Sequence, residues 1–162
     1  MTPFWKLYKA SSCSLKLKGA NQEEVFAEMV DVMVKGKALD ASLKDDALKA
    51  LISREKKAST GVGQNVAIPH VKVEGLKQAV VSVGIHPEGV EWKALDGAPA
   101  QIFFVVLRPG ANAPDHDPDR HLEMMRWIAS LGREGDFRNF ARAAKTRSEL
   151  VNLLKEMSSA IG

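Results

Sequence analysis

The residues best suited to chemistry lie in the run from Thr60 to His70, Thr-Gly-Val-Gly-Gln-Asn-Val-Ala-Ile-Pro-His, which ends on a histidine fixed behind a proline. Gly61 and Gly63 permit positive φ and a close approach of other groups to the backbone. Pro69 holds its own φ at about −65° and pushes Ile68 toward an extended conformation. His70 is therefore expected to leave the backbone in a defined direction, as a presented nucleophile would.

A histidine held in this way can accept a phosphoryl group. An imidazole with the ordinary pKa of about 6.5 is mostly neutral at neutral pH and is nucleophilic toward phosphorus. A planar guanidinium can hold the phosphoryl oxygens by two hydrogen bonds, and Arg54 is the candidate for this role. Hydroxyls of Ser59 and Thr60 and amides near Gly61 and Gly63 could donate further hydrogen bonds. Such positioning and electrostatics supply most of the catalysis of phosphoryl transfer.

The same segment resembles the active-site signature of enzyme IIA domains of the bacterial phosphoenolpyruvate-dependent sugar phosphotransferase system. The class that it resembles includes the fructose, mannitol and nitrogen-regulatory members. The matching residues run from about Leu15 to the C-terminus and are Arg54-Glu55, Ser59-Thr60-Gly61, Val62-Gly63, Val66 to His70, His121-Leu122, Asp136-Phe137 and Ser148-Glu149-Leu150.

The resemblance implies a phosphocarrier. It makes His70 the residue that takes the phosphoryl group from the phosphocarrier protein HPr and passes it to a IIB component or to a regulatory target. Arg54 matches an active-site arginine of the family, and His121 matches a second histidine beside the first. The resemblance implies no cofactor and no metal ion. Because no IIB or IIC region is fused to this chain, the nitrogen-regulatory branch is favoured over a sugar-specific carrier.

One residue departs from the family pattern. The family usually has a small residue directly after the active histidine, whereas this chain has Val71. A branched side chain there predicts bulk next to the phosphoryl site. It motivates an alternative function, a non-catalytic regulatory binding module that keeps the fold but transfers the phosphoryl group poorly.

Other constellations of functional residues fit less well. Asp115, Asp117 and Asp119 alternate as in a calcium-binding loop, but Arg120 and Arg126 stand where glycine and glutamate are required. A solvated acidic loop is also a simpler interpretation of these aspartates than a metal site with the neighbouring histidines. The segment around Gly61 lacks the Lys-Ser/Thr of a nucleotide-binding P-loop, and no serine hydrolase elbow is present.

Composition narrows the class of protein. The 162 residues suit one domain, and the net charge of +3, from 23 basic and 20 acidic residues, is too small to indicate a nucleic-acid partner without a basic patch. The longest apolar run, Ile102 to Leu107, is too short to enter a membrane as a spanning helix. No secretory signal precedes Ser14, and the single Cys13 fits a reducing compartment. A cytoplasmic protein is expected.

The elements that must position His70 follow from periodicity and capping. We expect helices from the Asn21 cap to Gly36 and from a Ser42 cap to near Arg54. Three more are expected around residues 122–131 and 137–144 and after a Thr146 cap. Ala79 to Ile85 and Ile102 to Leu107 predict buried strands, with a weak edge strand at residues 15–17 and an edge strand or turn at residues 88–92. His86 is expected in an exposed turn.

Helices before and after a set of strands predict an α/β fold, a single layered domain with a mixed central β-sheet and helices on both faces. Residues 1–14 are expected to form an N-terminal arm and residues 15–162 the enzyme IIA domain. Trp5 and Tyr8 leave two alternatives for the arm, which either packs on the domain or is flexible.

Overall fold

The computed structural model describes residues 3–110, 112–113 and 116–160. Its β-sheet is built around a central strand, β5 (Ala100–Arg108). β4 (Val80–Val90) pairs with one side of β5 in antiparallel orientation. β2 (Val66–Ala67) and β3 (His70–Lys72) pair with the other side, one after the other and parallel to it. β1 (Gly61–Gly63) pairs antiparallel with β2. The sheet is therefore mixed, as the sequence predicted.

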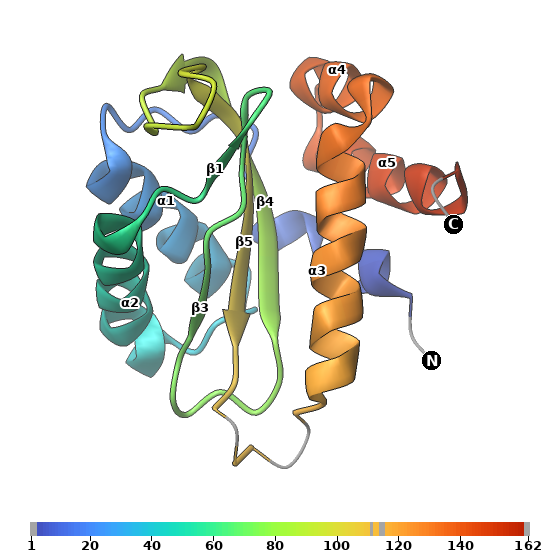
Figure 1. Ribbon diagram of the computed structural model, residues 1–162. Helices are drawn as coiled ribbons and strands as arrows, with labels where there is room; N and C mark the ends of the chain where they lie inside the picture. The colour runs from blue at the N-terminus through green and yellow to red at the C-terminus, as the bar shows by residue number, and fades with distance from the viewer. Residues whose placement is uncertain (1–2, 111, 114–115, 161–162) are drawn as a thin grey trace.

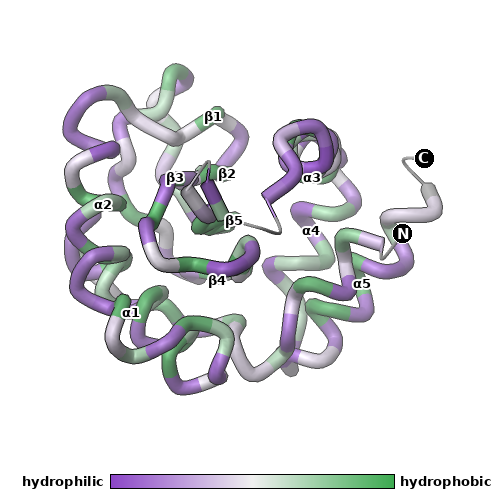
Figure 2. The backbone as a smooth tube through the Cα atoms, turned by 90° about the horizontal axis from the view of Figure 1, so that it is seen from below, coloured by the Kyte–Doolittle hydropathy of each residue, from purple (hydrophilic) through white to green (hydrophobic). Residues whose placement is uncertain are grey.

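Helices cover both faces of this sheet (Figures 1 and 2). α1 (Gln22–Lys35) and α2 (Lys44–Lys57) lie on one face. α3 (Pro118–Arg133), α4 (Gly135–Ala143) and α5 (Arg147–Ala160) lie on the other. The α/β layered fold predicted from the order of elements is confirmed.

The two faces of β5 belong to two different apolar cores because side chains alternate along a strand. Phe103, Val105 and Leu107 join the cluster under α1 and α2. Ile102, Phe104 and Val106 join the cluster under α3, α4 and α5. The alternation decides which side chains of the neighbouring β3 face which helices, and therefore where His70 and Val71 point.

Two predicted helix caps are confirmed. The Asn21 side chain accepts a hydrogen bond from the Glu24 amide at 2.9 Å, and the Thr146 hydroxyl accepts one from the Glu149 amide at 3.0 Å. Each cap satisfies an amide that lacks a partner in the first turn of a helix. α1 and α5 therefore begin where the capping residues place them.

The predicted cap of α2 is wrong. Ser42 lies inside a short 3₁₀ helix, η3 (Ala41–Leu43), and the Asp40 carboxylate accepts its amide at 2.9 Å and its hydroxyl at 2.8 Å. α2 then starts at Lys44 without a side-chain cap. It also continues to Lys57, so Arg54 lies in its last turn and not at its end.

The prediction of an exposed turn at His86 is also wrong. β4 continues through a bulge to Val90, so the predicted separate strand or turn at residues 88–92 is mostly part of it. His86 is only 4% exposed, and its Nε2 lies 2.9 Å from the carbonyl oxygen of Gly19. The segment before α1 covers this histidine, which no local pattern in the sequence indicates.

The N-terminal segment packs on the α3 and α5 side of the domain, which answers the alternative left open by the sequence. It contains η1 (Phe4–Leu7) and η2 (Ala10–Ser12). Tyr8 is 2% exposed, and its ring centroid lies 5.8 Å from that of Trp127. The chain then runs beside β4, where Ser14 forms a parallel bridge to Gly84. A domain boundary at residue 15 stays a prediction.

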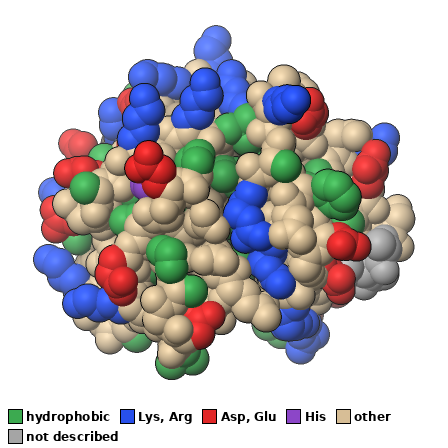
Figure 3. All heavy atoms as spheres, turned by 90° about the horizontal axis from the view of Figure 1, so that it is seen from above, with side chains coloured by type: hydrophobic (Ala, Val, Ile, Leu, Met, Phe, Trp, Pro, Cys, Tyr) green, Lys and Arg blue, Asp and Glu red, His purple; other side chains and the backbone are tan. Residues whose placement is uncertain are grey.

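Surface charge is divided among several groups of side chains. On the face drawn in Figure 3, Lys and Arg gather along one edge and in a short line in the middle, and Asp and Glu are scattered over the rest of the face. Within the described ranges, no helix is both long and apolar enough to cross a membrane.

Candidate functional site

The glycine-rich segment forms a hairpin that leads into His70. Gln64 and Asn65 join β1 to β2 with φ of 56° and 70°, as a two-residue hairpin turn requires. The Asp96 carboxylate fixes this turn by accepting a hydrogen bond from the Gln64 amide at 2.8 Å. Gly63 has φ of 94°, which strains any residue with a Cβ, and a Cβ there would also lie in tight contact with the same carboxylate, at 3.1 Å, so glycine suits this position best.

Pro69 separates β2 from β3 at the point where His70 emerges. Proline has no amide hydrogen to donate, so the pairing with β5 is interrupted on the donor side. Its carbonyl still accepts a hydrogen bond from the Val106 amide at 2.9 Å, which keeps the chain against β5. His70 then opens β3 opposite Val106. The proline therefore fixes where the histidine stands along the sheet.

The imidazole of His70 is half-buried and oriented by the backbone. Its Nδ1 lies 3.1 Å from the carbonyl oxygen of Ile68. A carbonyl oxygen only accepts, so Nδ1 carries the proton in this hydrogen bond. In the neutral ring Nε2 then has the free lone pair. Nε2 is therefore the nucleophilic atom of this side chain.

His121 lies in the first turn of α3, also half-buried. Pro118 begins this helix, and the Asp117 carboxylate caps it by accepting the amides of Asp119 at 3.0 Å and Arg120 at 3.3 Å. These contacts fix the backbone that carries the His121 side chain.

Burial lowers the pKa of His121, and positive charge on Arg108, His70 and His116 lowers it further. Desolvation disfavours the charged imidazolium, and neighbouring cations disfavour it too. The His121 ring is therefore neutral at neutral pH. The effect of His70 on His121 also shows that the fold brings these two histidines, which lie far apart in the sequence, close to each other.

Arg108 is a member of this site that the sequence analysis did not identify. It is the last residue of β5, and it lies beside Lys72 of β3, two residues along from the pair His70 and Val106. Val106 belongs to the apolar cluster on the α3 side, so alternation places Arg108 on that same side. In the sequence, Arg108 stands out only as a cation directly after a predicted buried strand. Which residues lie next to it depends on how β3 and β5 are aligned, and this the sequence does not show.

Arg54 lies at the other end of this region. It occupies the last turn of α2, and its Nη1 donates to the carbonyl oxygen of Ala58 at 2.7 Å. The contact satisfies a carbonyl just beyond the helix. Within the described residues, no hydrogen bond or ion pair joins Arg54 to His70 or His121. In this structure Arg54 therefore stabilises the segment between α2 and the hairpin.

Ser59 and Thr60 use their hydroxyl hydrogens inside the protein. The Ser59 hydroxyl donates to the Trp92 carbonyl at 2.5 Å and accepts the Gly61 amide at 3.0 Å. The Thr60 hydroxyl donates to the buried Glu55 carboxylate at 2.6 Å and accepts from Trp92 Nε1 at 3.1 Å. Direct donation to a phosphoryl group would have to replace one of these hydrogen bonds. The two hydroxyls anchor the base of the hairpin.

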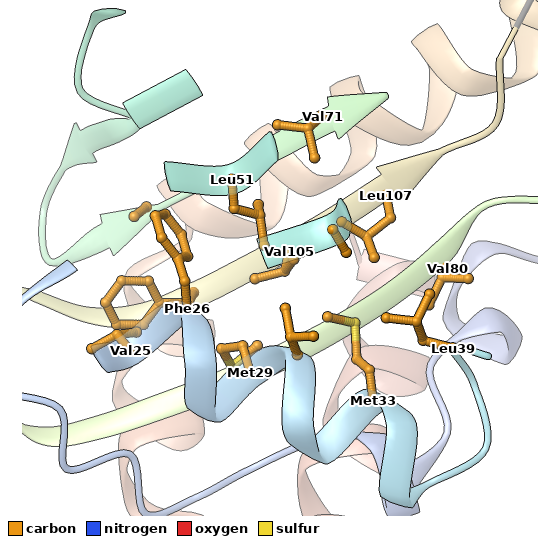
Figure 4. Close-up of a cluster of buried hydrophobic side chains, with 14 of the residues drawn as sticks. Val25, Phe26, Met29, Met33, Leu39, Leu51, Val71, Val80, Val105 and Leu107 are labelled. Carbon is orange, nitrogen blue, oxygen red and sulfur yellow. The ribbon is translucent and has the colours of Figure 1, made fainter. Parts of the chain in front are cut away.

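Val71 points away from His70, into the core. It is 8% exposed and belongs to the apolar cluster under α1 and α2, which also contains Leu51 and Leu107 (Figure 4). Neighbouring residues of a strand point to opposite faces, so the valine methyl groups and the histidine ring are separated by the sheet. The predicted bulk beside the phosphoryl site is wrong. This removes the reason for proposing a non-catalytic binding module.

Metal-ligating residues do not converge in the part of the chain that the structure describes, since no group of three or more His, Cys, Asp or Glu there could hold an ion. His116 and His121 have ring centroids 6.4 Å apart. Asp115, the first aspartate of the calcium-like pattern, lies outside the described residues.

Comparison with known proteins identifies the family to which this chain belongs. The family "Phosphoenolpyruvate-dependent sugar phosphotransferase system, EIIA 2" matches residues 6–157. The chain belongs to this family, and its role is that of a phosphocarrier.

Three relatives show the range of this similarity. A nitrogen regulatory protein of Pseudomonas aeruginosa is 36% identical over 110 residues, 67% of this chain and 68% of that protein. The crystal structure of the nitrogen regulatory protein IIA-Ntr from Neisseria meningitidis has a TM-score of 0.80 at 26% identity, covering 93% of this chain and 98% of that one. Enzyme IIA mannitol of Escherichia coli, in complex with phosphorylated enzyme IIB mannitol, shares the fold with a TM-score of 0.68 at 18% identity, over 92% and 99% of the chains.

Proposed function

We propose that His70 carries the phosphoryl group on Nε2, receiving it from phospho-HPr and passing it to a IIB component or a regulatory target protein. The observation that supports this most directly is the hydrogen bond between Nδ1 of His70 and the Ile68 carbonyl. It leaves Nε2 as the nitrogen with a free lone pair, on a side chain that the surrounding hairpin holds in place.

The transfer step follows from this tautomer. The Nε2 lone pair attacks the phosphorus atom, a new P–N bond forms, and the P–N bond in the phosphohistidine of the donor breaks, returning its electron pair to the donor ring. Nδ1 of His70 keeps its proton, so the phosphorylated ring is cationic while the hydrogen bond to Ile68 persists. A cationic ring is a good leaving group, which suits onward transfer to the next protein.

His121 acts as the second imidazole of the site in this proposal. Its pKa is lowered, so the ring is neutral and has one N–H to donate to a phosphoryl oxygen. Arg54, Ser59, Thr60, Gly61 and Gly63 act by fixing the hairpin that presents His70.

Within the family, we place this protein in the nitrogen-regulatory branch. The nitrogen regulatory relatives from Pseudomonas and Neisseria support it, and a sugar-specific carrier is the alternative within the same family. The single cysteine, Cys13, is buried and unpaired, which suits the reducing cytoplasm where we place the protein.

The test is incubation with phosphoenolpyruvate, enzyme I and HPr, followed by intact mass and acid treatment. The parent chain is expected to gain one acid-labile phosphoryl group, whereas His70→Ala gains none. His116→Ala is the matched control, because it removes another half-buried histidine near the site and should leave phosphorylation intact. An undiminished adduct on His70→Ala would remove His70 from the proposal.

A further inference from the structure

Arg108 stands on the same face of the sheet as the proposed nucleophile. His70 pairs with Val106, and Lys72 pairs with Arg108, in a parallel register. Paired residues of adjacent strands project to the same face, and so do residues two apart on one strand. His70, Val106 and Arg108 therefore all project toward α3, where His121 lies. Leu107, between them, points into the opposite core.

The Arg108 side chain is half-buried and has no partner for its charge among the described residues. No hydrogen bond or ion pair to its guanidinium is found within residues 3–110, 112–113 and 116–160. Its neighbour across the strand pair, Lys72, is instead paired with Glu74 at 3.3 Å. A partly desolvated guanidinium is normally paired. One without a partner in the described ranges, on the same face of the sheet as His70 and close to His121, is suited to bind an anion that arrives during function.

Two acidic side chains in the described segments next to β5 and α3 have other partners. Asp117 accepts two amides at the start of α3, and Glu74 pairs with Lys72. The electrostatic effect of Arg108 on His121 places its charge close to the second imidazole of the site. Positive charge at this position disfavours the protonated form of His121 and would attract a phosphoryl group.

We propose that the Arg108 guanidinium binds the phosphoryl oxygens when Nε2 of His70 carries the group, a role that rests on the function proposed above. The planar guanidinium offers two parallel N–H donors that match two phosphoryl oxygens. Arg108 would thereby supply the forked cation that the sequence analysis assigned to Arg54, whose Nη1 donates to the Ala58 carbonyl.

The first experiment measures initial rates of phosphorylation by phospho-HPr for Arg108→Gln and Arg108→Lys. Losing a charged hydrogen-bond donor is expected to slow Arg108→Gln by about 10- to 100-fold. Arg108→Lys, which keeps the charge but loses the fork, is expected to fall between Arg108→Gln and the parent. Arg126→Gln is the matched control, because Arg126 is an exposed arginine of α3, and it should keep the parent rate. An Arg108→Gln rate within about twofold of the parent would overturn the proposal.

The second experiment does not need phosphotransfer. Imidazole resonances of His70 and His121 are followed by NMR while inorganic phosphate is added to the parent and to Arg108→Gln. The parent is expected to show saturable shifts that the variant lacks. The pKa of His121 is also expected to be higher in Arg108→Gln, because a neighbouring cation has been removed.

The two experiments separate the possible failures. A parent chain that is never phosphorylated but shows phosphate-dependent shifts that require Arg108 would contradict the proposed function and keep the anion site. Suppose instead that the parent and Arg108→Gln are phosphorylated at the same rate and respond equally to inorganic phosphate. This result would contradict the role of Arg108 and leave the proposed function of His70 standing.

Discussion

The carbonyl oxygen of Ile68 lies 3.1 Å from Nδ1 of His70, two residues further along the chain. Pro69 between them restricts the backbone so that this contact forms within the same short segment. This one local hydrogen bond selects the tautomer with the proton on Nδ1, so the lone pair of Nε2 is free to accept a phosphoryl group. In the proposed function, the motif Ile-Pro-His acts through this geometry.

Replacing Val71 by glycine tests the consequence of its burial. The substitution removes a buried side chain from the cluster with Leu51 and Leu107 and adds backbone freedom, so we expect a loss of roughly 2–4 kcal/mol in the free energy of unfolding. Phosphorylation of the folded protein should not become faster. Urea denaturation and initial rates measure the two effects. Val62→Gly, at a position 57% exposed, is the control. A stable and faster Val71→Gly protein would show that the valine obstructs the site.

Thr60→Val tests whether the hydroxyl anchors the hairpin. The variant keeps the shape of the side chain but removes a hydrogen bond to the buried Glu55 carboxylate and the acceptor for Trp92 Nε1. We expect a loss of about 2–4 kcal/mol, since a charged group and a buried N–H lose partners. Thermal or urea unfolding checks this. Thr60→Ser, which keeps the hydroxyl, should recover most of the stability, and equal stability of Thr60→Val and Thr60→Ser would contradict the anchoring role.

The lowered pKa of His121 predicts a pH dependence of stability. The unfolded chain has the ordinary histidine pKa, so between that value and the lower folded value the unfolded state binds more protons. The contribution of His121 is therefore fully present above pH of about 6.5 and is lost as the pH falls toward the folded pKa. Unfolding midpoints across this range should fall less steeply for His121→Gln than for the parent. If the unfolding midpoints of His121→Gln and of the parent fell equally steeply with pH, a lowered pKa of His121 in the folded protein would be contradicted.

Much of the fold and part of the site could be predicted from sequence, because the signals are local. Asn21 and Thr146 cap helices by contacts within three residues. His70 is presented by the residues directly before it. The class of fold followed from the order of helices and strands.

The failures concern relations between distant segments. His86 is buried because the segment near Gly19 folds over it, and Ser42 cannot cap α2 because Asp40 already holds it in a 3₁₀ turn. The direction of Val71 follows from strand alternation once β3 is known to begin at His70. Arg108 enters the site through the register of β3 and β5, which sequence periodicity does not define.

The central claim is that Nε2 of His70 carries the phosphoryl group. The direct measurement is ¹⁵N and ³¹P NMR of protein labelled with ¹⁵N-histidine and phosphorylated with phosphoenolpyruvate, enzyme I and HPr. The structure predicts phosphorus coupling to Nε2 of His70, with Nδ1 still protonated and bonded to Ile68. Phosphorus attached to Nδ1 of His70 or to either nitrogen of His121, or a chain that accepts no phosphoryl group, would contradict the claim.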